Sequence, residues 1–391
     1  MSVFLPEDRS HQQLLDELAA IAERPLTQAT ALPPGLYTHE AIAELEQQHI
    51  FSQQWLCAGR ADSIPNTNDY LTYHIGVQPI VVIRQADGEL QAFANICRHR
   101  MMQLLDGRGE CENGRITCPY HAWSYGIDGT LLGAPQMKRT GGFEAANLSL
   151  TKVRCEVWQG WIYVTLNDAG ESVAKQLEGL DELTAHYEMS HYVHVVQQDH
   201  LWDTNWKLLT ENFMEGYHLP VAHKNTVGAD FPIHRTQFSS SNADDAFTYQ
   251  TFMKTSAAPV GNAHSSNSRL KGEQRRTSIM PTVFPSHMYV LAPDHLWYLS
   301  LQPKGVGQVH IRYGAALAPE VVENEADPDA YIREFIEFLD EVNEEDRFVV
   351  EGIYSGAKAP LSKPGPLCWL EQSIHEFAQY LSRRLCAESH P

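Results

Sequence analysis

The chain has 391 residues, of which 43% are hydrophobic and 20% charged, a composition typical of a globular protein with two or three domains. Its formal net charge of −20 predicts no nucleic-acid partner and no membrane partner, because phosphate backbones and anionic membranes bind basic surfaces. The seven cysteines are odd in number and widely spread, which favours a reducing, cytoplasmic setting over a disulfide framework.

The first 166 residues change from helical to strand periodicity. Residues 1–54 are predicted to form an N-terminal helical segment that packs on the C-terminal domain, with helices within 1–30 and 38–53. From residue 55 onward apolar residues tend to alternate, and three turn signals predict hairpins, at Asp87-Gly88, Asp128-Gly129 and Gln159-Gly160. Residues 55–166 are therefore expected to form a small antiparallel β-domain.

Residues 167–391 are predicted to form a second domain, an antiparallel sheet covered by helices, so the fold class is α+β. Expected strands lie within 191–202, 283–301 and 309–317, and expected helices at 171–190, from Asp327-Pro328 onward and at 369–385. Asp327 suits the N-cap of the long helix and Pro328 its first position. The polar segment 224–280 is predicted to be loop-rich, either as a substrate-access loop or as a disordered stretch.

Two short motifs in the β-domain have metal-ligand spacing. Cys97-Arg98-His99 is followed, after 18 intervening residues, by Cys118-Pro119-Tyr120-His121. Two thiolates and two imidazoles can hold one zinc ion. They can equally hold a two-iron, two-sulfur cluster with both thiolates on one iron and both imidazoles on the other. The spacing alone leaves both readings open.

The residues around these ligands resemble a Rieske cluster-binding domain, with Cys-Arg-His-Arg and then Cys-Pro-Tyr-His-Ala-Trp inside a β-domain. The resemblance implies a [2Fe-2S] Rieske cluster bound by Cys97, His99, Cys118 and His121. In one place the chain departs from the family, which usually has glycine where Met101 stands. The first loop is therefore expected to follow a different backbone path without loss of a ligand. Cys111, between the two motifs, is interpreted as a bystander.

The segment 203–223 carries two histidines that are candidate iron ligands. On a helical wheel one face is predicted to be core-facing, with Trp206, Leu209, Phe213 and Tyr217, and the opposite face carries Glu211, Glu215 and His218. His218 and His223 are five residues apart, so an unbroken helix could not direct both to one metal. Pro220 is expected to kink the helix and allow shared ligation.

This segment resembles the iron-binding segment of Rieske non-heme iron oxygenase α-subunits, the aromatic-ring-hydroxylating oxygenase superfamily, through Asn205-Trp206-Lys207, Glu211-Asn212, Glu215-Gly216-Tyr217-His218 and His223. The resemblance implies a helix-grip-like catalytic domain and a mononuclear Fe(II) held by His218 and His223 in a 2-His-1-carboxylate site. The spacing Asn-x-x-Glu-x-Tyr-His is similar to that of the carnitine, glycine betaine and choline monooxygenases. Asn212 is expected to point toward the open iron position.

Helical periodicity selects a candidate for the third ligand. In the helix after Asp327 the apolar residues predict one stripe, with Tyr331, Phe335, Phe338, Val342, Val349 and Ile353. Asp346 lies within this stripe and Glu345 lies at its edge as the second choice. A buried carboxylate needs a strong partner, and a metal ion or an arginine can provide one. The family pattern, present here as Asn343 to Arg347, agrees with the choice of Asp346.

Three protein ligands leave positions on the iron open for O2 beside a small organic substrate. The chain has no Gly-x-Gly-x-x-Gly motif, so NAD(P)H is expected to be oxidised by a separate flavin- or iron-sulfur-containing reductase, directly or through a ferredoxin. The resemblance also implies a head-to-tail homotrimer. In that arrangement Glu215 would connect the partner subunit's His121 to His218 of its own chain.

The chain is accordingly predicted to be the terminal oxygenase of a multicomponent Rieske system, a monooxygenase or dioxygenase. Its substrate is expected to be a small quaternary ammonium compound, which it would hydroxylate or oxidatively N-demethylate. An aromatic cage for such a cation is expected from Phe284, Tyr289, Trp297 and Tyr298. One alternative is an oxygenase that binds an aromatic acid through Arg275 or Arg276. Two further alternatives are a Rieske electron carrier and a zinc-stabilised binding protein.

Overall fold

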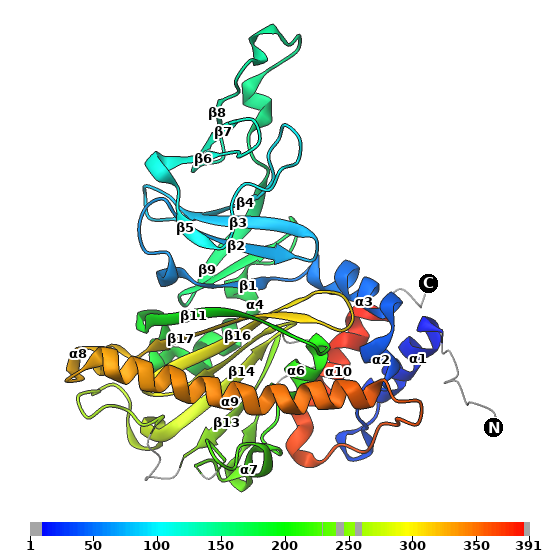
Figure 1. Ribbon diagram of the computed structural model, residues 1–391. Helices are drawn as coiled ribbons and strands as arrows, with labels where there is room; N and C mark the ends of the chain where they lie inside the picture. The colour runs from blue at the N-terminus through cyan, green and yellow to red at the C-terminus, as the bar shows by residue number, and fades with distance from the viewer. Residues whose placement is uncertain (1–9, 229, 240–245, 255–259, 387–391) are drawn as a thin grey trace. The chain divides into compact units, whose positions relative to one another are not determined.

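The computed structural model describes residues 10–228, 230–239, 246–254 and 260–386 (Figure 1). The chain divides into two compact units. The β-unit is residues 51–175, and the large unit combines residues 1–50 with residues 176–391. The sequence placed these boundaries at 54/55 and 166/167. The structure thus groups the N-terminal helices with the C-terminal half of the chain.

The β-unit contains a seven-stranded antiparallel sheet in the order β1-β10-β9-β4-β3-β2-β5 and a three-stranded sheet β6-β7-β8. Its strands are β1 (Leu56–Arg60), β2 (Asp69–Ile75), β3 (Gln78–Arg84), β4 (Leu90–Ala94), β5 (Arg108–Glu110), β6 (Arg115–Thr117), β7 (Ser124–Gly126), β8 (Leu131–Gly133), β9 (Lys152–Trp158) and β10 (Trp161–Thr165). The three expected hairpins are present, with positive φ at Gly88, Gly129, Gln159 and Gly160 as tight turns require. The prediction of an antiparallel β-domain is confirmed.

The large unit is built on a second seven-stranded antiparallel sheet, in the order β11-β17-β16-β15-β14-β13-β12. Its strands are β11 (Val193–Trp202), β12 (Gln237–Phe238), β13 (Phe247–Met253), β14 (Thr277–Val283), β15 (His287–Leu291), β16 (His295–Pro303) and β17 (Val309–Leu317). The prediction that 224–280 is loop-rich is wrong for β12, β13 and the start of β14. These strands bury polar side chains, among them Thr248, Gln250 and Ser278, so their sequence lacks the expected apolar alternation.

Helices cover this second sheet, which confirms the α+β prediction. The described α-helices of the large unit are α1 (His11–Ala22), α2 (Gly35–Thr38), α3 (Glu40–Glu46) followed by a π-helix (Gln47–Phe51), α5 (Glu178–Thr184), α6 (Trp206–Phe213), α7 (Leu219–Ala222), α8 (Pro319–Asn324), α9 (Pro328–Ala357) and α10 (Gln372–Leu385), and α4 (Val173–Gln176) lies at the boundary of the two units. α6 packs on β16, α9 on β11, α10 on β13 and α1 on α10. Figure 1 shows α9 as the long orange helix.

Helix boundaries follow their caps. The side chain of Asp327 accepts a hydrogen bond from the backbone N–H of Ala330, and Pro328 opens α9, as predicted. The helix expected over 38–53 begins later, because His39 rather than Thr38 accepts from the Ala41 N–H. The segment 171–190 forms two short α-helices and 3-10 turns rather than one helix. In the described part of the chain, no helix combines the length and apolarity needed to cross a membrane.

Candidate functional site

Two loops of the β-unit bring together the four residues expected to hold the cluster. Cys97 follows β4 and Cys118 follows β6, and both are buried, whereas His99 and His121 are exposed. The two imidazole rings lie 4.7 Å apart between centroids, and the His99 ring stacks on Trp123 at 4.8 Å. Two buried thiols beneath two adjacent, exposed imidazoles suit a cluster with an inner thiolate-bound iron and an outer imidazole-bound iron.

The two loops have the same backbone hydrogen bonds. In each, the cysteine N–H donates to the carbonyl five residues later, and the N–H four residues later donates back to the cysteine carbonyl, at 2.8 to 3.1 Å. That fourth residue is Met101 in the first loop and Ala122 in the second, with φ of 58° and 56°. The prediction that Met101 gives the first loop a different path is therefore wrong. Met101 adopts the left-handed conformation that glycine would adopt with less strain.

Tyr125 contacts the first cluster loop through its hydroxyl group. Its hydroxyl lies 3.4 Å from the Cys97 sulfur and accepts a hydrogen bond from the Arg98 backbone N–H at 3.0 Å. Cys111 lies in the same hydrophobic core, where burial raises the pKa of its thiol to about 11. Its packing among apolar side chains is consistent with the interpretation of Cys111 as a bystander.

In the large unit, α6 ends five residues before the first candidate iron ligand. It ends at Phe213, and α7 starts directly after His218 with Pro220 in its first turn. Two predictions are therefore wrong. Pro220 opens a new helix instead of kinking the old one, and Tyr217 is 55% exposed instead of facing the core. His218 and His223 stand at the two ends of the short helix α7, which lets both rings face the same point.

Buried polar pairs connect α6 to the N-terminal helices. Glu211 accepts hydrogen bonds from the Tyr37 hydroxyl at 2.8 and 3.0 Å, and Lys207 forms a buried ion pair with Glu46. Burial raises the pKa of Glu211 to about 8, although the Tyr37 hydrogen bond and the Lys207 charge lower it in part. Tyr37 of α2 and Glu46 of α3 thus hold α6, which carries Asn212 beside the candidate iron site, in place.

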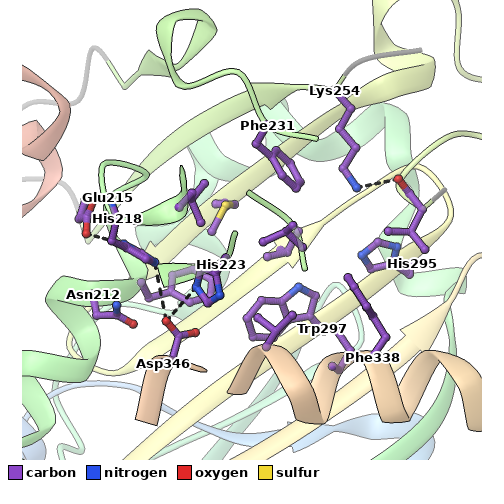
Figure 2. A pocket seen from close by; sticks show the side chains of 18 residues that line it. Asn212, Glu215, His218, His223, Phe231, Lys254, His295, Trp297, Phe338 and Asp346 are labelled. Atoms are coloured by element: carbon purple, nitrogen blue, oxygen red, sulfur yellow. Dashed lines mark hydrogen bonds and ion pairs between the residues drawn. The ribbon is translucent and has the colours of Figure 1, made fainter. Parts of the chain in front are cut away.

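His218, His223 and Asp346 form a group of potential metal ligands, each offering one atom within 4.8 Å of the others. Asp346 Oδ1 lies 3.1 Å from His223 Nε2 and 3.7 Å from His218 Nε2 (Figure 2). Ligand atoms at neighbouring octahedral positions are about 3 Å apart when metal–ligand bonds are about 2.1 Å. These donors therefore fit a mononuclear 2-His-1-carboxylate iron site.

Two glutamates hold the histidine rings by their other nitrogens. Glu215 accepts from His218 Nδ1 and from the His218 backbone N–H, which lies 3.1 Å away. Glu345 accepts from His223 Nδ1 at 2.8 Å and from the Thr226 hydroxyl at 2.6 Å. Both Nε2 atoms are thereby left for the metal. Glu345, the second choice for a ligand, lies on the wrong ring nitrogen for that role and positions His223.

Burial lowers the pKa of His223, but the hydrogen bonds and charges of Asp346 and Glu345 outweigh burial and raise it above the ordinary value. Two carboxylates around one nearly buried imidazole give the group an excess of negative charge that a divalent cation would neutralise. The charge of the site, like its geometry, therefore suits a metal ion.

A largely apolar pocket extends from these ligands, with about 690 Å³ of empty space that is partly open to solvent. Asn212, Glu215, His218, His223 and Asp346 lie at one end, and Lys254 and His295 lie away from them in Figure 2. Its other described lining residues are Phe213, Leu219, Val227, Phe231, Val260, Met280, Val290, Trp297, Phe338, Leu339 and Val342. Asn212, Glu215 and His218 also line a second cavity beside the N-terminal segment.

The pocket walls differ from the predicted cage. Trp297 lines the pocket, but Phe284 stacks on Tyr380, and Tyr289 and Tyr298 are fully buried outside the lining. Arg275 donates to four backbone carbonyl groups and does not line the pocket, so the predicted arginine anchor for an aromatic acid is wrong for this residue.

The sequence pattern pointed to some of the residues that line the pocket but not to others. Phe338 belongs to the apolar stripe predicted for α9, whereas Ile353 of that stripe is half exposed. Phe231 and Lys254 lie in the segment expected to be loop-rich, and no periodicity pointed to them. A buried lysine in particular goes against the usual exposure of that residue type.

Comparison with known families decides the identity. A family model described as Ring hydroxylating alpha subunit (catalytic domain) matches residues 180–387, more than half of the chain. The chain belongs to the ring hydroxylating alpha subunit family. A second model, Rieske [2Fe-2S] domain, matches residues 54–154 of this alpha subunit. Its cofactors are accordingly a Rieske [2Fe-2S] cluster and a mononuclear iron, and the family expected from the sequence motifs is confirmed.

Relatives of this alpha subunit include quaternary ammonium oxygenases. The carnitine monooxygenase oxygenase subunit of Escherichia coli (strain K12) is 34% identical over 200 residues, 50% of this chain and 53% of that protein. The matched stretch thus spans about half the length of that relative. The glycine betaine monooxygenase oxygenase subunit of Pseudomonas aeruginosa (strain UCBPP-PA14) is 26% identical over 389 residues, 91% of this chain and 89% of that protein.

Among solved structures, the quaternary ammonium Rieske monooxygenase CntA in complex with its substrate L-carnitine superposes with a TM-score of 0.78. It is 22% identical in sequence, and the match covers 96% of this alpha subunit and 99% of CntA. At this level of identity the similarity establishes a shared fold across nearly the whole chain.

Proposed function

We propose that this alpha subunit is the terminal oxygenase of a multicomponent Rieske system. It would use O2 and electrons from a separate NAD(P)H-dependent reductase, directly or through a ferredoxin, to hydroxylate a small quaternary ammonium compound. Oxidative N-demethylation is the outcome when the hydroxylated carbon is an N-methyl group. The observation that carries the proposal is the convergence of His218, His223 and Asp346 at one end of an apolar pocket.

In this proposal His218, His223 and Asp346 hold the iron, and Cys97, His99, Cys118 and His121 hold the cluster. Bound Fe(II) supplies oxygen activation, which the side chains of the chain lack. Glu215 and Glu345 orient the two imidazoles through their Nδ1 atoms, which leaves each Nε2 atom for the iron. Asn212 is buried and lies beside the three ligands. This position supports the expectation that its side chain points toward the open iron position.

The pocket suits a cationic group because aromatic rings form much of its wall. Phe213 and Trp297 pack edge to face at 5.6 Å, and Phe231 and Phe338 also line the cavity. Ring faces attract ammonium groups by about 0.5–2 kcal/mol each, most strongly in desolvated sites. The same apolar walls exclude water from the reacting end. Trp297 is the member of the predicted cage that keeps its role in this proposal.

We further propose a head-to-tail homotrimer in which the partner subunit's His121 meets Glu215. Both units have exposed apolar side chains that such a contact could cover. On the large unit they are Tyr217, Val221, Phe348, Ile353, Leu361 and Trp369, and on the β-unit they are Met101, Met102 and Tyr120. Exposed apolar groups of this number mark interaction surfaces. Because Glu215 also binds His218, the contact would link cluster to iron. Analytical ultracentrifugation tests this assembly: a sedimenting species of three copies is expected, and one of one or two copies would contradict it.

The setting proposed for the system is the cytoplasm, in keeping with seven free cysteines. The test of function is a substrate screen with a surrogate reductase that compares O2 uptake with product formed. Glycine betaine, carnitine and choline are expected to give coupled turnover, and benzoate and other aromatic acids are not. Coupled turnover of aromatic acids alone would refute the substrate class. Protein that contains a cluster but binds no second iron would instead favour an electron carrier.

A further inference from the structure

Lys254 is a buried lysine that lines the same pocket as the metal ligands. It follows β13, and only 2% of its surface is exposed. Its Nζ donates to the carbonyl oxygen of Val260 at 2.8 Å and lies 4.7 Å from the centroid of the Phe231 ring (Figure 2). An ammonium group has three N–H donors. Among the described residues, one hydrogen bond and one ring face therefore leave part of its donor capacity unused.

Within the described residues, no carboxylate forms an ion pair with Lys254. Asp294 and Asp230 act on it from a distance. Asp294 is already engaged, because it accepts from His295 Nδ1 at 2.7 Å and from the backbone N–H of Gly261 at 2.6 Å. Burial lowers the pKa of Lys254 to about 8, as desolvation of an ammonium group does. A buried charge without a close counter-charge is costly, and an anion on the ligand would offset that cost.

The position of Lys254 in the pocket specifies where that anion would lie. Figure 2 places Lys254 and His295 away from His218, His223 and Asp346, with Trp297 and Phe338 nearby. The acids among the described lining residues are Glu215 and Asp346, and both are engaged at the metal end. A purely cationic substrate would meet an uncompensated ammonium group at the far end of the pocket. A substrate with an acid group at that end would pair with it.

We propose that Lys254 binds an anionic group, a carboxylate in the simplest case, on the part of the substrate that lies away from the iron. This inference rests on the proposed function and narrows its substrate class. The preferred substrates are zwitterions that combine a quaternary ammonium group with a carboxylate. The aromatic rings bind the ammonium group and Lys254 sets the orientation of the molecule, so that one methyl or methylene group faces the iron.

Binding to the anaerobic, cluster- and iron-loaded enzyme tests this assignment by calorimetry. Glycine betaine, γ-butyrobetaine and choline all carry a trimethylammonium group, but choline has a hydroxyl in place of the carboxylate. Of glycine betaine and γ-butyrobetaine, the compound that binds more tightly is expected to bind the wild-type enzyme at least about 10-fold more tightly than choline does. Lys254→Met keeps an apolar side chain without the charge. It is expected to weaken both carboxylates roughly 10- to 100-fold and to leave choline unchanged or tighter.

Two controls separate a binding role from damage to the fold. Lys304→Met removes a lysine at the β16–β17 turn, outside the pocket, and should leave all three affinities unchanged. Lys254→Gln keeps a neutral donor and should fall between wild type and Lys254→Met for the carboxylates. Retained choline binding and iron content show that each variant is folded.

The outcomes distinguish this inference from the proposed function. Equal losses for choline and the carboxylates in Lys254→Met, or a wild-type preference for choline, would overturn the role of Lys254 and leave the oxygenase proposal standing. If benzoate binds in a Lys254-dependent way and is hydroxylated while no ammonium compound binds, Lys254 remains the anion site. In that case the quaternary ammonium substrate class is refuted.

Discussion

The two candidate metal sites of this chain are built in different ways. The cluster site comes from two loops of one unit, each with the same backbone hydrogen bonds around its cysteine. The iron site joins α7 to a residue of α9 that is 123 positions away from His223 in the sequence. The first site depends on local hairpin structure, and the second depends on how α9 packs against α6 and α7. Local motifs can therefore specify one site, while the other exists only in the folded domain.

The largest effect is expected when the α9 contribution is removed. Asp346→Ala should abolish iron binding and lower product formation on the order of 1000-fold, because two histidines alone hold Fe(II) weakly. The cluster should be unaffected, since its ligands are in the other unit. Iron analysis and the reduced-cluster EPR signal measure the two sites separately. Glu344→Ala, an exposed change two residues away on α9, is the matched control. Loss of the cluster signal as well would contradict the independence of the two sites.

The next effect concerns the connection between the sites. Glu215→Gln should leave both metals bound but reduce product formation about 100-fold, because the amide accepts less strongly than the carboxylate from His218 Nδ1 and, in the proposed trimer, from the partner subunit's His121. Single-turnover reduction of O2 with a pre-reduced cluster measures the coupling. Glu341→Gln, on the α9 helix and outside both cavities, controls for the charge change. Full product formation by Glu215→Gln would contradict the proposed role of Glu215 as the link between the cluster and the iron.

A smaller effect should appear in the pH dependence of stability, which Glu211 should give to the large unit but not to the β-unit. The raised pKa of Glu211, about 8, means that folded protein keeps a proton that the unfolded chain loses above about 4.5. Its contribution to stability is thus fully present at low pH and declines as pH rises toward 8. Glu211→Gln keeps the neutral form, so its stability advantage over wild type should grow from pH 5 to pH 8. No carboxylate is buried among the described residues of the β-unit.

Thermal unfolding of the holoenzyme at several pH values measures this difference. Near-ultraviolet circular dichroism follows the aromatic side chains of both units, and the visible absorbance of the cluster follows the β-unit alone, so a transition seen only in the first signal belongs to the large unit. Glu44→Gln, at an exposed position of α3, should unfold like wild type at every pH. Parallel pH profiles for Glu211→Gln and wild type would show that Glu211 is ionised in the folded protein.

The smallest effect lies within the cluster site. Met101→Gly relieves a left-handed backbone conformation at an 80% exposed position, so it should be neutral or stabilising by up to about 1 kcal/mol. Met102→Gly, at the next residue, has no such strain to relieve and should be destabilising by about 0.5–1 kcal/mol. Denaturant unfolding, followed by cluster absorbance, compares the two. Equal losses in both variants would mean that Met101 is not strained.

The contrast between the sites also explains what the sequence could predict. The cluster motif, the hairpin turns and the Asp327 cap are local signals, and the structure has each of them where it was expected. Asp346 was selected by periodicity because α9 is long and regular. The role of Met101 was misjudged, since a departure from a family pattern gave no indication that the chain would accept local strain there.

The remaining features depend on tertiary packing. The end of α6 was misplaced because Tyr217 continues its apolar spacing, although Gly216, a poor helix former, lies only two residues beyond the C-cap Met214. β13 was missed because its buried face carries Thr248 and Gln250, which bind other polar groups inside the protein. Lys254 could not be identified, since only the assembled pocket shows that this lysine is buried.

Because Glu345 and Asp346 are adjacent in α9, the position of this helix bears on how iron binds to the folded protein. These adjacent residues of α9 reach opposite nitrogens of one imidazole, His223. A shift of α9 by even part of a turn would release the ring on both sides at once. We therefore expect iron to bind only after α9 has packed against α7, and any shift of α9 to weaken iron binding. The four cluster residues all lie in the β-unit, so we expect the cluster to bind without any contribution from α9.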